Sequence, residues 1–92
     1  MIIGFRSRRL EHLFERGDRA RLPSSHVARI EEILTLLNTA ERAAEMDQPG
    51  YRLHPLSGPL TGFWSVMVSR NWRIIFRFDG SNVTDVDYVD YH

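Results

Sequence analysis

The first half of the chain carries apolar residues at helical spacing. Between residues 8 and 16 they fall three and four positions apart among charged residues, which predicts a helix that Gly17 ends as a C-cap. After Pro23 a longer helix is expected, because five aliphatic residues recur at offsets of three, four and seven. These residues are Val27, Ile30, Ile33, Leu34 and Leu37. Each helix has one apolar stripe and must pack it against another element.

Beyond residue 50 the apolar period changes to two, and β-branched and aromatic residues become frequent, which predicts strands. The change follows the turn signal Gln48-Pro49-Gly50. A strand is expected in each of four segments, residues 51–54, 63–69, 72–78 and 82–91, and the turns between them at residues 57–59, 70–71 and 79–81. A short apolar stretch at residues 2–5 suggests a further strand at the start.

This order, βααββββ, predicts an α+β fold with a single domain over residues 1–92. Two helices should cover one face of a mostly antiparallel sheet of four to five strands. Alternation in segment 72–78 divides its residues between two faces. One set is Trp72, Ile74, Phe76 and Phe78, and the other is Arg73, Ile75 and Arg77. The first set is expected in the core, and the second is expected to face solvent or a site.

Composition narrows the function. Ninety-two residues suffice for one domain, and the absence of cysteine excludes disulfides, thiolate metal sites and thiol catalysis. The N-terminal residues lack the long apolar region of a signal peptide, and no stretch is long and apolar enough for a membrane span. A cytoplasmic location is therefore expected.

The net charge is zero, which at first argues against nucleic acid as a partner. However, the charges are segregated along the chain. Residues 1–30 carry seven arginines and three acids, and residues 51–78 carry four arginines and no acid. Residues 31–50 and 79–92 are acidic. Two basic blocks of this kind can meet RNA locally although the total charge is zero.

Four histidines are candidates for proton transfer near neutral pH. His12 and His26 lie in the predicted helices and are interpreted as surface residues. His54 precedes a proline in a segment without acids, and His92 ends the chain, so both occupy unusual positions for structural histidines. Their spacing matches no zinc motif, and no metal or other cofactor is predicted.

The last three residues, Asp90, Tyr91 and His92, place a carboxylate beside two groups that can exchange protons. Cleavage of RNA by its own 2'-hydroxyl needs a base, an acid for the leaving oxygen and a cation for the phosphorane. With His54 and Arg73 these residues supply that set. From chemistry alone, a polar tail without function is an equally good interpretation. Arg73 and Arg77 could likewise be solvated charges on the sheet.

Several segments together resemble the HigB family of bacterial toxins, and the resemblance spans nearly the whole chain. They are LFERGD at 13–18, PGYRLHPL at 49–56, GFWSV at 62–66, NWRIIFRF at 71–78 and DVDYVDYH at 85–92. Each segment alone is weak, whereas their order and spacing are specific.

The resemblance implies a RelE-like fold, ribosome-dependent cleavage of mRNA, and neutralisation by a HigA-like helix-turn-helix antitoxin that also binds operator DNA. It implies catalytic roles for five residues, each of the type found in the family. They are His54, Arg73, Asp90, Tyr91 and His92. RNA or ribosome contacts are expected at four more positions, Arg52, Ser57, Arg70 and Arg77.

One position departs from the family pattern. Family members often have lysine where this chain has Ser57, so one phosphate contact is missing or moved, and Arg70 is a candidate to replace it. This departure favours the alternative that the chain is an inactive module of the same fold, acting only as an antitoxin partner or co-repressor. A small RNA-binding protein that stacks bases on its sheet is less favoured, because the aromatic residues lie mainly on the expected core face.

Overall fold

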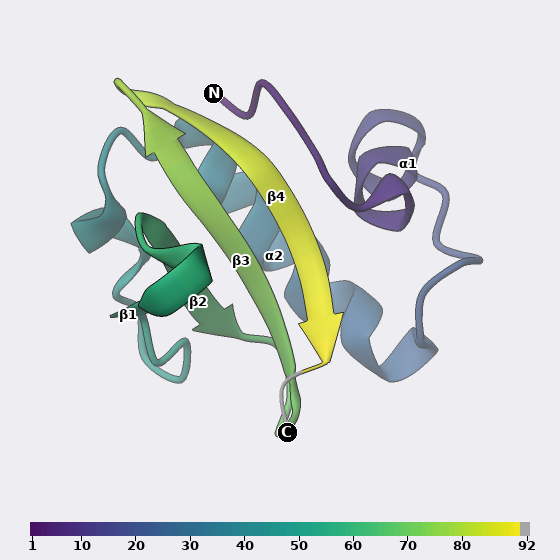
Figure 1. The fold of residues 1–92 in the computed structure, drawn as a ribbon. Helices are drawn as coiled ribbons and strands as arrows, with labels where there is room; N and C mark the ends of the chain where they lie inside the picture. The colour runs from purple at the N-terminus through teal and green to yellow at the C-terminus, as the bar shows by residue number, and fades with distance from the viewer. Residues whose placement is uncertain (91–92) are drawn as a thin grey trace.

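The computed structural model describes residues 1–90 (Figure 1). Helices α1 (Arg8–Arg16) and α2 (Ser24–Thr39) precede a four-stranded antiparallel sheet in the order β1-β2-β3-β4. The strands are β1 (His54–Pro55), β2 (Phe63–Met67), β3 (Trp72–Asp79) and β4 (Asn82–Asp90). Two 3-10 turns, η1 (Ala43–Met46) and η2 (Gly58–Leu60), lie in the connections. The predicted α+β architecture is confirmed.

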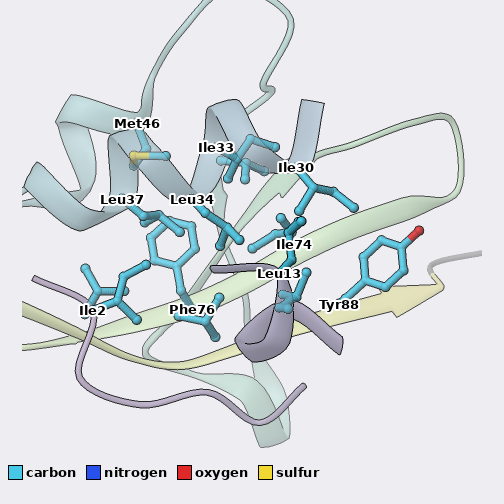
Figure 2. Close-up of a cluster of buried hydrophobic side chains, with 14 of the residues drawn as sticks. Ile2, Leu13, Ile30, Ile33, Leu34, Leu37, Met46, Ile74, Phe76 and Tyr88 are labelled. Carbon is cyan, nitrogen blue, oxygen red and sulfur yellow. The ribbon is translucent and has the colours of Figure 1, made fainter. Parts of the chain in front are cut away.

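Both helices form where their apolar spacing predicts them. Ser7 caps α1 by accepting a hydrogen bond from the Leu10 amide at 3.2 Å, and Gly17 ends the helix in a left-handed conformation with φ 67°. Helix α2 buries all five of its predicted core residues. Helix α2 crosses behind the sheet, and its aliphatic side chains point toward Ile74 and Phe76 of β3 (Figures 1 and 2).

The sheet has a second, smaller apolar cluster on the face away from the helices. Leu56, Phe63 and Ile75 are buried there, with η2 folded over them. Ile75 was expected to face solvent or a site. This expectation was wrong, because Ile75 is buried in this second cluster. The connection between β1 and β2 turns back across this face and covers part of it. Arg73 and Arg77 lie on the uncovered remainder.

The N-terminal segment forms two isolated parallel bridges to β4, Ile2 to Val83 and Phe5 to Val86, instead of the predicted strand. Between these bridges Asp85 adopts a positive φ of 53°, and Gly4 passes so close to Thr84 that a Cβ would lie 2.7 Å from its Oγ1. The kink at Asp85 interrupts the ladder, so the segment covers the edge of β4 without becoming a fifth strand.

The strand predicted at residues 51–54 also differs in the structure. Residues 51–53 belong to a turn in which the Tyr51 amide bonds to the Gln48 carbonyl at 3.0 Å and Arg52 has φ 50°. Strand β1 begins only at His54 and includes Pro55. Proline is tolerated here because β1 is an edge strand and one side of its backbone needs no partner.

Candidate active site

Strand register places His54 on the outer face of the sheet, the face away from the helices. His54 pairs with Ser65, Ser65 with Ile75, and Ile75 with Asp87, so these residues form one row across all four strands. His54 is exposed at the edge of this row, and its Nδ1 lies 3.1 Å from the carbonyl oxygen of Arg52. Its ring is therefore held by the turn that precedes it.

Arg73 lies on the same face in the neighbouring row, between Met67 of β2 and Val89 of β4. Its Nη1 donates to three carbonyl oxygens of the hairpin that joins β2 and β3, those of Ser69 at 2.8 Å, Arg70 at 3.2 Å and Trp72 at 3.2 Å. These acceptors hold the guanidinium at the hairpin end of the sheet. A cation fixed in this way can stabilise developing negative charge without reorganising first.

The turn before His54 reaches the same end of the sheet. The Tyr51 carbonyl accepts a 2.7 Å hydrogen bond from the amide of Met67, the strand partner of Arg73. Arg52, His54, Arg70 and Arg73 therefore gather around the hairpin end of the sheet. Along the chain these residues are separated by up to 21 positions, so the tertiary fold brings them together.

A second group of arginines occupies the other end of the outer face. Arg77 Nε lies 2.5 Å from Asp85 Oδ2, and Arg6 Nε lies 3.4 Å from Asp85 Oδ1. The hydrogen bond from Arg77 holds the pKa of Asp85 below its ordinary value, against an opposing effect of burial. Both arginines remain about half exposed, so each can still face a phosphate. Ser57, at the start of η2, is exposed on the same side of the molecule, next to the Leu56–Phe63 backbone bond.

Asp90 is placed differently from His54 and Arg73. It ends β4 opposite Trp72, and the register puts it on the face of Trp72 and Tyr88, which is the helix side. Its backbone nevertheless lies at the hairpin end, beside the residue that precedes Arg73. Tyr91 and His92, the other two predicted catalytic residues, lie outside the described residues.

An aromatic cluster around the buried Tyr88 supports the end of β4, and no pattern in the sequence indicated it. Trp72 stacks on Tyr88 with ring centroids 4.4 Å apart, and the Tyr88 hydroxyl lies 2.5 Å from Nδ1 of His26. The Arg9 guanidinium lies over the Tyr88 ring at 5.0 Å. Burial raises the pKa of Tyr88. His26 was interpreted as a surface residue, which was wrong: helical spacing shows that His26 adjoins the apolar stripe, but not that a tyrosine from β4 would reach it.

Asp87 is a further polar residue on the outer face, and it was not among the site residues predicted from the sequence. It lies in the row of His54, and its Oδ1 accepts a hydrogen bond from the Tyr88 amide at 2.9 Å. The alternation of residues 85, 87 and 89 suggests that they share one face. However, the kink at Asp85 breaks this alternation, so only the register shows which face Asp87 occupies.

Comparisons with known proteins identify the family of this chain. A family model described as the RelE-like toxin of the type II toxin–antitoxin system HigB matches residues 3–92. The chain is 39% identical over 92 residues to "Endoribonuclease HigB" of Proteus vulgaris, with both chains covered completely. It is 33% identical over 95 residues to "Toxin HigB-1" of Vibrio cholerae serotype O1, covering all of this chain and 98% of that protein.

Solved structures share the fold. The YoeB/ParE toxin from Agrobacterium tumefaciens superposes with a TM-score of 0.63 at 20% identity, covering all of this chain and 99% of that one. A chain of the YoeB–YefM complex from Staphylococcus aureus gives the same TM-score at 16% identity, with 100% and 98% coverage. The full-length family match, supported by this fold, shows that the chain belongs to the HigB-like family of RelE-like toxins of type II toxin–antitoxin systems.

Proposed function

We propose that this toxin is an endoribonuclease that cleaves messenger RNA on the ribosome, and that its active site lies at the hairpin end of the outer sheet face. The observation that carries the proposal is the convergence of His54 and Arg73 on that face, since a proton-transfer group and a fixed cation are what RNA cleavage by a 2'-hydroxyl requires. The relative named an endoribonuclease supports the class of reaction.

In the proposed reaction a base removes the proton of the 2'-hydroxyl, and the oxygen attacks the adjacent phosphorus. The bond from phosphorus to the 5'-oxygen breaks, and an acid protonates that oxygen, which leaves a 2',3'-cyclic phosphate and a 5'-hydroxyl. Arg73 stabilises the charge on the phosphorane. We propose that His54, Asp90, Tyr91 and His92 divide the base and acid roles among them, with Asp90 acting from the end of β4 beside the hairpin and not from the outer face itself.

The arginines along the outer face are proposed to bind the RNA backbone. Arg73 and Arg77 are four residues apart on one strand, which corresponds to roughly 13 Å at about 3.3 Å per residue. Arg52 and Arg70 flank the hairpin end, and Ser57 lies near the other end. These groups would hold a short stretch of mRNA across the face with the scissile phosphate near Arg73.

An antitoxin is the expected partner of a protein in this family, and the YoeB–YefM complexes show a toxin of this fold bound to one. We propose that the partner here is a HigA-like helix-turn-helix protein, and that this toxin meets operator DNA only through it. We further propose a cytoplasmic location, where ribosomes are available. None of the helices within residues 1–90 is long and apolar enough to cross a membrane.

The test is expression of the gene alone while mRNA 5' ends are mapped in translating cells. We expect growth arrest and new ends inside translated codons, which should disappear with His54→Ala, Arg73→Ala or His92→Ala. His12→Ala is the matched control, because it removes a histidine from α1, away from the outer face. A purified comparison of naked mRNA with mRNA on ribosomes then tests ribosome dependence.

Two outcomes would contradict the proposal. New ends that persist with both His54→Ala and Arg73→Ala would place the active site elsewhere. Normal growth and no new ends with the unaltered protein would instead favour the inactive module that binds the antitoxin.

A further inference from the structure

The backbone at Arg52 is strained in a way that bears on the chemistry of His54. Arg52 has φ 50°, a left-handed conformation that residues with a side chain rarely adopt. Such conformations persist only where the surrounding structure enforces them, and they are concentrated at functional sites. The carbonyl oxygen of this strained residue is the one that lies 3.1 Å from Nδ1 of His54.

The residue before Arg52 is buried and is fixed by two contacts with α2. Tyr51 is 2% exposed, its hydroxyl donates to Glu32 at 2.5 Å, and the Arg29 guanidinium lies over its ring at 4.5 Å. Arg29 also donates to the Gly50 carbonyl at 2.8 Å. Burial, followed by the hydrogen bond to Glu32, raises the pKa of Tyr51 to about 12, so the phenol stays neutral and keeps donating.

The residues after Arg52 are fixed as well. Leu53 packs against the main core, and His54 and Pro55 pair with Ser65 and Trp64 of β2. Arg52 is therefore held between two anchored segments, with its side chain exposed and its backbone bent. Its carbonyl has little freedom to turn away from the imidazole.

A carbonyl oxygen can only accept a hydrogen bond, so Nδ1 of His54 must be the donor. A neutral imidazole carries a single N–H, and if that proton is on Nδ1 then Nε2 bears the lone pair. We propose that Arg52 is a positioning residue, whose left-handed backbone fixes His54 in the Nδ1–H tautomer and presents Nε2 as the proton acceptor for the 2'-hydroxyl. This inference rests on the proposed function of the site.

The tautomer can be measured without any assay of activity. Long-range ¹H–¹⁵N spectra of the purified toxin, recorded at a pH where imidazoles are neutral, distinguish a protonated Nδ1 from a protonated Nε2. We expect the proton of His54 on Nδ1. A neutral His54 with its proton on Nε2 would overturn the inference, whether or not the toxin cleaves mRNA.

Two variants separate the backbone of Arg52 from its charge. Both Arg52→Gly and Arg52→Val remove the guanidinium, but glycine adopts a positive φ freely whereas a β-branched residue resists it. We expect Arg52→Gly to keep the Nδ1–H tautomer of His54 and to raise the KM for ribosome-bound mRNA, because the proposed phosphate contact of the guanidinium is lost. Relative to Arg52→Gly, we expect Arg52→Val to lose the tautomer preference and to lower kcat by about tenfold or more, which is part of the roughly 10²–10⁴-fold that a general base contributes, with little further change in KM.

Thermal unfolding of both variants shows whether each is folded at the assay temperature. Should the valine variant not fold, Arg52→Asn and Arg52→Ala supply the same comparison, since asparagine tolerates the left-handed region better than alanine. Equal kcat for the backbone-tolerant and backbone-intolerant variants, both folded, would overturn the positioning role. Absence of cleavage by the unaltered toxin would instead count against the proposed function and leave the spectroscopic result standing.

Discussion

Ser7 and Ser65 show how one residue type has opposite consequences in two environments. The Ser7 hydroxyl accepts a hydrogen bond from the Leu10 amide and so satisfies one of the free donors at the start of α1. Ser65 is fully buried in the row of His54, and its hydroxyl has no hydrogen-bond partner within the described part of the chain. Burying a polar group without a partner costs free energy.

We therefore expect two serine-to-alanine replacements to change the free energy of unfolding differently. Ser7→Ala should destabilise the protein by about 1 kcal/mol through loss of the cap. Ser65→Ala should leave the stability unchanged or raise it, because it removes an unpaired hydroxyl and keeps most of the packing. Urea unfolding of both variants tests this, and a loss of more than about 1 kcal/mol for Ser65→Ala would reveal a hidden partner of its hydroxyl.

At the scale of elements, β4 joins parts of the molecule that are distant in sequence. One edge pairs with β3, and the other carries the two bridges of the N-terminal segment. Asp85, at the kink of β4, binds Arg77 of β3 and Arg6 of that segment. A single carboxylate thus links three pieces of chain on the outer face.

This link predicts a pH dependence of stability. The pKa of Asp85 is lower in the folded protein than its ordinary value of 3.8, so its stabilisation is complete above that value and is lost as the pH falls through the folded value. Asp85→Asn should therefore destabilise the protein at neutral pH by about 1 kcal/mol or less and flatten the decline of stability below about pH 4. Asparagine tolerates the positive φ of this position, so the comparison isolates the charge.

Unfolding of Asp85→Asn between neutral and acidic pH provides the measurement. A second series at high salt is a useful control, because salt should narrow the difference from the unaltered protein at neutral pH. If the two proteins decline in parallel as the pH falls, Asp85 does not provide this stabilisation.

At the scale of the whole molecule, the zero net charge conceals a separation of charge between regions. The segment 51–78, which has no acids, forms most of the outer face and the hairpin end, and the acidic segment 31–50 covers the end of α2 and η1. A protein that docks on ribosomal RNA needs local positive charge and not a positive total.

The position of Arg70 tests this view. Arg70→Gln should raise the KM for ribosome-bound mRNA several-fold and weaken the salt dependence of binding, because an exposed arginine at the hairpin end would no longer meet a phosphate. Arg19→Gln makes the same change on the helix side, where Arg19 pairs with Glu31 at 3.0 Å, and should have little effect. Equal effects of the two replacements would mean that the hairpin end is not the docking surface.

The success of prediction from sequence depended on how local each feature is. The helices and the strands 72–78 and 82–91 follow from periodicity over seven or more residues, and they appear within a residue or two of their predicted bounds. The strands predicted for the short segments 2–5 and 51–54 were wrong, because the first forms isolated bridges and most of the second precedes β1. A stretch of four residues carries too little pattern to distinguish a strand from a turn or from isolated bridges.

The candidate site shows the same division. His54 and Arg73 could be selected from residue type and family resemblance, and the family prediction is confirmed by the comparisons. Their roles remain proposals. Residue type and resemblance did not reveal three features of the structure. The Arg73 guanidinium is held by three carbonyl oxygens, Asp90 lies on the helix side of the sheet, and His26 contacts Tyr88. Each of these depends on contacts between elements.

The sequence by itself determined the family, the fold class and the residue types available for chemistry, because periodicity, composition and motif spacing are properties of the chain alone. Only the tertiary structure decided which face each residue occupies, that β4 kinks at Asp85, and that the strained carbonyl of Arg52 meets His54. The physical reason is that strand register and backbone strain are fixed by long-range pairing and packing. A shift of one residue in register would turn each side chain to the opposite face without changing a letter of the sequence.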